Sequence, residues 1–319
     1  MRAGNASCAR PTSRPSRVAR QFHNQPEQSH QHQFLVDLWA EVRRETAGAV
    51  NVCVHASNGR VSGSDPKVLE MVLAGEIEFA TMMGPLIGSL VPAAEIQGVP
   101  FAFHNSQQAH AALDGSLGDF LREEIQKQGI YAVPGGALEN GFRQICSVSR
   151  AVRGPDDLAG YRMRVPAGRI LAELFEALGA TPVSVNIDGL HAALAQGSVD
   201  GHENPLAIIE VNGLQELTKH VCMSNHAWSG FNLIANLGYW RSLAEDAQDA
   251  IHRAAKTHVA RQRDYAMGLN RELEKRLRVE HVPQAPFRAR IGPALYARWK
   301  ERCGTTAWRL LRDAGGRLD

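Results

Sequence analysis

The chain has 319 residues, of which 44% are hydrophobic and 21% charged, which is enough apolar material for one large or two medium cores. Its 35 basic and 33 acidic residues nearly balance, and beyond the N-terminus no Lys/Arg cluster follows one face, so nucleic acid is not an expected partner. No apolar run approaches the roughly 20 residues of a membrane-spanning helix.

The N-terminal segment differs from the rest of the chain. Its first 20 residues hold five arginines and no acidic residue, and they lack the apolar centre of a secretory signal. We therefore expect residues 1–17 to be a disordered tail, an expression remnant or upstream sequence from a misplaced start site. No export signal is evident in the sequence.

The cysteines predict neither a disulfide framework nor a metal site. They are odd in number, widely spaced, and show no CxxC or Cys/His ligand spacing. The set is Cys8, Cys53, Cys146, Cys222 and Cys303. We expect no metal and no cofactor, and we expect the cysteines in apolar strands to behave as small buried hydrophobes.

Strands and helices alternate from the first apolar segment onward. A strand over 17–22 precedes a helix that ends at Gly48, and the segment 49–56 reads as the next strand. Ser64 and Pro66 open a helix that leads into a strand over 76–83. This βαβαβ order predicts a parallel α/β sheet.

Further helix and strand segments fill the middle of the chain. A helix over 107–128 precedes strand-like segments at 130–135, 142–149 and 161–166, and a further helix ends at Gly179. A second α/β unit then follows, with strand, helix and strand segments over 182–204. Two such units predict two lobes with a cleft between them, and open α/β sheets bind ligands beyond the carboxyl ends of their strands.

One predicted helix is unusually long. Ser242 and Glu245 form a possible capping box, apolar residues then recur every four positions, and no proline interrupts the chain before Pro283. A continuous helix of roughly 35 residues would span about 50 Å, which is enough to bridge both lobes, with a possible bend near Gly268.

The segment "VDGHENPL" places His202, Glu203 and Asn204 side by side. Adjacent side chains diverge in any regular structure, and their spacing matches no metal-binding signature. A strand end or turn accounts for them, with Asn204 as the N-cap of a helix that Pro205 opens. Two other polar residues, Arg143 and Arg164, lie between apolar neighbours on strand-like segments, so each is either paired at the surface or facing the cleft as a carboxylate clamp.

Several segments together resemble the DctP family, the extracytoplasmic solute-binding proteins of TRAP transporters. They include "HNQPEQSH", "GSDPKVLEMVLAGEIEF", "ENGFRQI", "DLAGYRMRVP" and "NHAWSGFNLIAN". The likeness runs from about Val18 to the end of the long helix, and order and spacing match throughout Asp157 to Leu206.

This resemblance implies an α/β, two-lobed periplasmic binding protein fold with a hinge and a long helix spanning both lobes. Lobe I would comprise 18–140 plus 230–268, and lobe II 141–229 plus 269–319. The protein would be periplasmic, would bind a small mono- or dicarboxylate, and would deliver it to TRAP membrane permease subunits.

The family's ligand contacts carry over position by position. Arg164 of the "RVP" strand would grip the carboxylate, while Arg143 and Asn204 would supply further polar contacts from the same lobe. Asn24 would join them from the first strand-to-helix loop. His202 stands where the family has glutamine, which leaves its hydrogen bonding and its pH dependence open.

The rest of the ligand is expected to be apolar or aromatic. After "EIEFA" the sequence reads "TMMGPLIG", where sugar-acid binders of the family place polar groups. With Trp228 and Phe231, Met83 predicts an apolar wall. Two alternatives remain: an enzyme acting on a carboxylate, with Glu203 or His202 as acid or base, and a sensor that presents its ligand to a membrane kinase.

Overall fold

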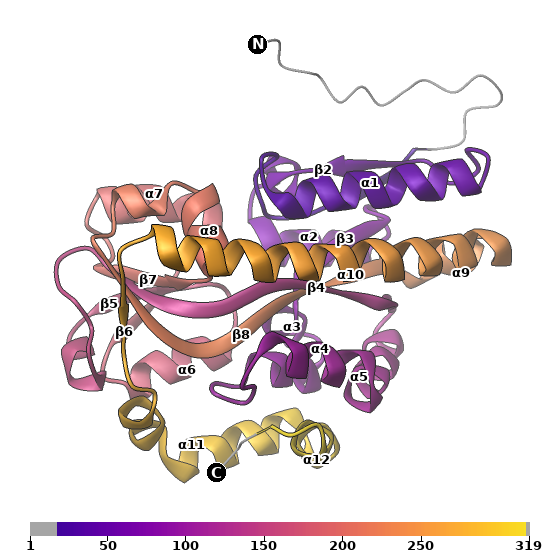
Figure 1. The fold of residues 1–319 in the computed structure, drawn as a ribbon. Coiled ribbons are helices and arrows are strands. Elements are labelled where there is room, and N and C mark those ends of the chain that lie inside the picture. Colours follow the sequence, from indigo (N-terminus) through magenta and orange to yellow (C-terminus); the bar gives the residue numbers. More distant parts are fainter. Residues whose placement is uncertain (1–17, 317–319) are drawn as a thin grey trace, which may run out of the picture.

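The computed structural model describes residues 18–316. The expectation of a disordered tail at 1–17 lies outside these residues. Figure 1 shows a mixed α/β molecule in which one twisted sheet is covered by helices on both faces. Among the described helices, none is long and apolar enough to cross a membrane.

A single sheet holds all nine strands that the structure describes, in the order β2-β1-β3-β8-β4-β7-β5-β6, with β9 pairing β8. The strands are β1 (Ala19–Phe22), β2 (Val52–His55), β3 (Phe79–Met83), β4 (Ile130–Ser147), β5 (Arg162–Val165), β6 (Thr181–Ser184), β7 (Gly201–Asn204), β8 (His220–Asn236) and β9 (Val279–His281).

Two long antiparallel strands, β4 and β8, run through both halves of the sheet. At one end β8 pairs β3, and at the other β4 pairs β7. Their register is irregular in between, where Gly141, opposite Ser229, has φ +117°. This irregularity coincides with the predicted lobe boundary after 140 and before 230, and its function as a hinge stays a prediction.

The N-terminal lobe confirms the predicted βαβαβ unit. Strands β2 and β3 lie on either side of β1 and are parallel to it. Helix α1 (His30–Glu45) begins at Ser29, whose side chain accepts a hydrogen bond from the amide of His32 at 3.2 Å. The other helices of this lobe are η1 (Ser57–Arg60), α2 (Ser64–Leu73), α3 (Gly84–Ile87), η2 (Pro92–Gly98), α4 (Ser106–Asp114) and α5 (Ser116–Lys127).

The second lobe confirms the second α/β unit. Strand β5 pairs in parallel with β6 and with β7, so the carboxyl ends of all three lie at one edge. Its helices are η3 (Pro155–Leu158), α6 (Arg169–Ala177), α7 (Ile187–Ala195), α8 (Leu206–Val211) and η4 (Leu214–Glu216). Pro205 is the N-cap of α8 and Asn204 ends β7, so Asn204 is not the helix cap that its position suggested.

The long helix is α10 (Glu245–Arg276), whose 32 residues extend about 48 Å. It follows α9 (Leu237–Ser242) and packs on α1 in one lobe, on α8 in the other and on β4, which runs through both, as predicted (Figure 1). The capping box is wrong: Ala244 is the N-cap, and the Ser242 hydroxyl donates to the carbonyl of Tyr239.

Two C-terminal helices, α11 (Ala285–Cys303) and α12 (Thr305–Asp313), cover the lower side of the molecule in Figure 1. They contact η2 and α5 as well as α6 and η3. Arg302 joins the two sides, because its guanidinium donates to Glu95 of η2 at 2.6 Å and to Glu173 of α6 at 2.8 Å. The C-terminal residues thus contact both lobes, and their assignment to lobe II stays a prediction.

Candidate functional site

A narrow cavity lies between the lobes, and it brings together six of the seven residues predicted to bind the ligand. The lobes meet beside it: the side chain of Asn186 donates to the carbonyl of Gly63 at 3.5 Å, and Gly168 lies against Pro85. The lining residues are Asn24, Gln25, Asp65, Met83, Asn140, Arg143, Arg164, Pro166, Ala167, Asn186, Ile187, Asn204, Ile208 and Phe231.

Arg164 carries the charge of this site. Its side chain is 2% exposed, and its Nε donates to the carbonyl of Val185 at 2.7 Å. Neither terminal nitrogen of the guanidinium has a hydrogen-bond partner within residues 18–316. Burial lowers the Arg164 pKa to about 10, against the opposing field of Glu203, so the group stays cationic at neutral pH. A buried cation with two free donors is suited to a ligand carboxylate.

Arg143, in contrast, is already paired. Its Nη2 donates to Glu203 Oε1 at 2.7 Å and to the Glu203 carbonyl at 2.8 Å, and its Nε donates to Oε2. The same guanidinium reaches Ser229 Oγ at 3.3 Å and Asn204 Oδ1 at 3.3 Å. Arg143 therefore brings hydrogen-bonding groups to the cavity but no net charge.

Glu203 is a structural anion. It is fully buried and does not line the cavity, and His226 Nε2 lies 3.2 Å from its Oε2. Burial alone would raise the Glu203 pKa, but the Arg143 guanidinium and the His226 hydrogen bond more than offset it and lower the pKa to about 2. A carboxylate so firmly ionised and enclosed is poorly suited to proton transfer.

The alternation of β7 explains why His202 and Asn204 differ from Glu203. Residues two apart on a strand share a face, and the Nδ2 of Asn204 lies 3.2 Å from Nδ1 of His202. Burial, followed by the charge of Arg164, lowers the His202 pKa to about 3, so the ring is neutral and accepts at Nδ1. His202 thereby holds the Asn204 amide with its oxygen toward Arg143.

The opposite wall comes from the N-terminal lobe. Asn24, in the loop after β1, donates to Asp65 Oδ2 at 2.8 Å and accepts from Gln25 at 2.7 Å. Met83, at the end of β3, and Phe231, opposite it on β8, supply the apolar part of this wall. Asn24 and Met83 thus line the same cavity as Arg143, Arg164 and Asn204, and their contact with a ligand stays a prediction.

Trp228 requires a correction, because it does not line the cavity. It is three positions from Phe231 on β8 and so points to the other face of the strand. Its Nε1 donates to Glu139 Oε2 at 2.9 Å, and its ring packs edge-on against Phe103 and His110. Trp228 is a core residue on the far side of the sheet.

Sequence reasoning missed four polar residues of the cavity: Gln25, Asp65, Asn140 and Asn186. Asp65 lies in the first turn of α2, where an acidic residue is expected for helix stability alone. Asn186 is the N-cap of α7, a position where asparagine is also common for structural reasons. For Asp65 and Asn186 the one available signal was their place in the chain, since both follow strand segments whose carboxyl ends were expected to border the cleft.

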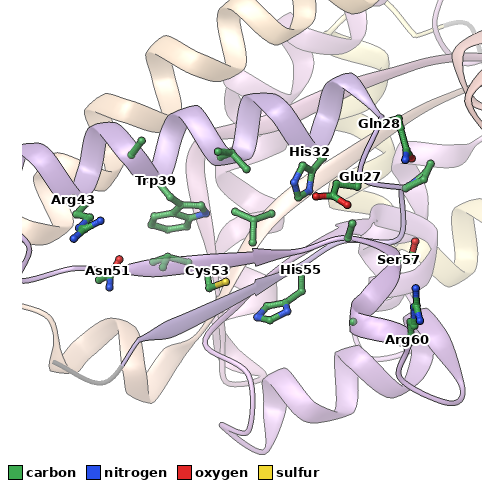
Figure 2. A pocket seen from close by; sticks show the side chains of 17 residues that line it. Glu27, Gln28, His32, Trp39, Arg43, Asn51, Cys53, His55, Ser57 and Arg60 are labelled. Atoms are coloured by element: carbon green, nitrogen blue, oxygen red, sulfur yellow. The ribbon is translucent and has the colours of Figure 1, made fainter. Parts of the chain in front are cut away.

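A second, wider hollow lies on the outer side of the N-terminal lobe (Figure 2). His32 and Trp39 reach into it from α1, and Cys53 and His55 line it from β2, the edge strand of the sheet. None of the predicted ligand-binding residues lines this hollow, and its charged residues Glu27, Arg43 and Arg60 are not buried as Arg164 is. The interlobe cavity is therefore the better candidate site.

Comparison with known proteins agrees with this geometry. Residues 22–301 match the model of the DctP family, the bacterial extracellular solute-binding proteins of family 7. The chain belongs to this family. Its family is one of solute-binding proteins rather than enzymes, and the resemblance noted in the sequence is confirmed.

Curated relatives of the DctP family share about 30% of their residues with the chain. A solute-binding protein of Verminephrobacter eiseniae is 30% identical over 292 residues, 90% of this chain and 86% of that protein. The C4-dicarboxylate-binding periplasmic protein DctP of Rhodobacter capsulatus is 29% identical over 231 residues, 71% of this chain and 66% of that protein. The uncharacterized protein y4mM of Sinorhizobium fredii is 31% identical, but the match spans only 39% of its length.

Solved structures share the fold. The sugar acid binding protein DctPAm of Advenella mimigardefordensis, in complex with galactonate, has a TM-score of 0.87 at 25% identity and covers 93% of this chain and 97% of that chain. TRAP periplasmic solute-binding proteins of Polaromonas with bound D-erythronate and of Sulfurospirillum deleyianum with bound succinate both have a TM-score of 0.85, at 24% and 22% identity. They cover 92% and 93% of this chain, and 97% and 98% of their own chains.

Proposed function

We propose that this chain is the solute-binding subunit of a TRAP-type transporter, which captures an organic acid through its carboxylate and delivers it to membrane permease subunits. In this role the protein works in the periplasm. The observation that carries the proposal is Arg164, a buried cation that lines the interlobe cavity and whose terminal nitrogens have no hydrogen-bond partner among the described residues.

The binding mechanism follows from groups on both walls. Ligand drives closure only by binding the closed form better than the open one, and this needs contacts from each lobe. Arg164 and Asn204 lie on one wall, and Asn24, Asp65 and Met83 on the other. Opening separates the walls and admits ligand, and closure removes the carboxylate and the guanidinium from water together, which strengthens their pairing.

The site favours binding over catalysis. Glu203, the carboxylate that the enzyme alternative requires, is buried against Arg143 and His226 and does not line the cavity. His202 is fully buried and neutral, and its Nδ1 faces Asn204. Neither group is placed to exchange a proton with a molecule in the cavity, and general acid–base catalysis requires such reach.

The names of relatives support a carboxylate ligand. The Rhodobacter capsulatus protein is named for C4-dicarboxylates, and the solved structures hold galactonate, D-erythronate and succinate. All of these ligands are organic acids, and the present cavity retains a cation that fits their shared group.

Isothermal titration calorimetry with an organic acid that the wild-type protein binds tests the proposal. Arg164→Ala should weaken binding by about 2 to 5 kcal/mol, and Arg164→Lys should weaken it markedly because an ammonium cannot make two parallel hydrogen bonds. Arg162→Ala is the matched control: Arg162 lies on the same strand but is half-exposed and paired with Asp200. Wild-type affinity in Arg164→Ala would remove Arg164 from the site.

A further inference from the structure

The wall that the N-terminal lobe contributes to the cavity is rich in hydrogen-bond acceptors. Asp65 is 8% exposed; its Oδ1 accepts from Asn58 Nδ2 at 2.6 Å and its Oδ2 from Asn24 Nδ2 at 2.8 Å. Each oxygen of an ionised carboxylate has room for a second hydrogen bond, so Asp65 retains acceptor capacity. Burial raises the pKa of Asp65 above its ordinary value, and the hydrogen bonds from Asn58 and Asn24, which favour the ionised form, offset this in part.

Gln25 adds a second acceptor to this wall. It is 3% exposed and lines the cavity, and its amide nitrogen is committed to Asn24 Oδ1 at 2.7 Å. Its Oε1 is buried and has no hydrogen-bond partner among the residues that the structure describes. A buried acceptor left in this state costs free energy unless a bound molecule supplies a donor.

The charges of the two walls are complementary to one anionic group only. The charge of Arg143 is matched by Glu203, so Arg164 is the one cavity-lining cation of the described residues without a carboxylate in hydrogen-bond contact. Asp65 faces it from the other lobe, and Asp188 acts electrostatically on both. A second ligand carboxylate would therefore meet Asp65, where like charges repel in a poorly solvated space.

We propose, on the basis of the function above, that the physiological ligand is a hydroxylated monocarboxylate. Its carboxylate binds Arg164, and its hydroxyl groups donate to Asp65 and Gln25. Asp65 is thus a specificity-determining residue that selects hydroxy acids over dicarboxylates. This replaces the expectation of a largely apolar ligand body, because Met83 and Phe231 share their wall with these acceptors.

Calorimetry with acids of equal length tests the inference. The four-carbon set is butanoate, erythronate and succinate, and the six-carbon set is hexanoate, gluconate with galactonate, and adipate. Wild-type protein should bind the hydroxy acid of at least one set at least tenfold more tightly than its unsubstituted and dicarboxylate counterparts. In Asp65→Asn this preference should shrink at least tenfold, with the dicarboxylate gaining relative to the hydroxy acid.

Asp264→Asn is the matched control: it removes the same charge, but Asp264 is exposed on α10 and does not line the cavity. It should keep the wild-type preference. The inference would be overturned if a dicarboxylate or an unsubstituted acid bound most tightly, or if Asp65→Asn lost the same affinity for every acid. Either result would leave the proposed function standing. If wild-type protein binds no acid of either set, the proposed function itself fails.

Discussion

Replacing Glu203 by glutamine should destabilise the protein strongly. The substitution keeps the shape of the side chain but leaves the Arg143 guanidinium buried without its counter-ion. The Glu203 pKa of about 2, against an ordinary value of 4.5, corresponds to about 3 kcal/mol of stability at neutral pH. Removing one member of a buried pair costs about 3 to 5 kcal/mol, which agrees with this value.

The contribution has a defined pH window. Because folding depresses the pKa of Glu203, its stabilisation is complete above about pH 4.5 and is lost as the pH falls through about 2. Urea unfolding should therefore show a large difference between wild type and Glu203→Gln at pH 7 and a smaller one near pH 3. Glu272→Gln, at an exposed pair with Lys275, should cost under about 1 kcal/mol. Wild-type stability of Glu203→Gln at pH 7 would refute the reasoning.

Other predictions concern His202 and two glycines. Folding lowers the His202 pKa from 6.5 to about 3, so the unfolding free energy of the wild type should fall by about 2 kcal/mol through this residue between pH 6.5 and pH 5. Urea unfolding at the two pH values should show a smaller fall for His202→Gln. Gly268→Ala should raise stability by about 0.5 to 1 kcal/mol, because Gly268 is inside α10 and an added Cβ meets only Arg271, at 3.9 Å. Gly141→Ala should lower it by about 1 to 3 kcal/mol, because its φ is +117° and an added Cβ would lie 2.9 Å from Asn270. The opposite order of melting temperatures for the glycine variants would contradict the backbone argument.

The secondary structure was largely predictable because its signals are local. Periodic apolar residues and strand-helix alternation indicated both α/β units and the long helix α10. The strand β4 was predicted as two segments because its Pro-Gly-Gly interruption reads as a turn. In the structure β8 pairs with both segments, so long-range pairing carries the strand through that interruption.

The candidate site was predictable only in part. The resemblance to the family placed Arg164 and Arg143, but nothing in the sequence shows that one is free and the other already paired with Glu203. Trp228 was misplaced because the irregular middle of β4 and β8 hides which strand face borders the cleft. Asp65 escaped notice because an acid at a helix start has an ordinary structural explanation.

The most direct test of the central claim compares one hydroxy acid with its neutral amide in thermal unfolding. A ligand that binds only the folded state at a hundred times its Kd adds about 2.7 kcal/mol of stability. Gluconate, or galactonate if it binds more tightly, should raise the Tm of the wild-type protein, while its amide should not, and Arg164→Ala should respond to neither. An equal shift with the amide, or a wild-type shift in Arg164→Ala, would contradict capture of the ligand through its carboxylate at Arg164.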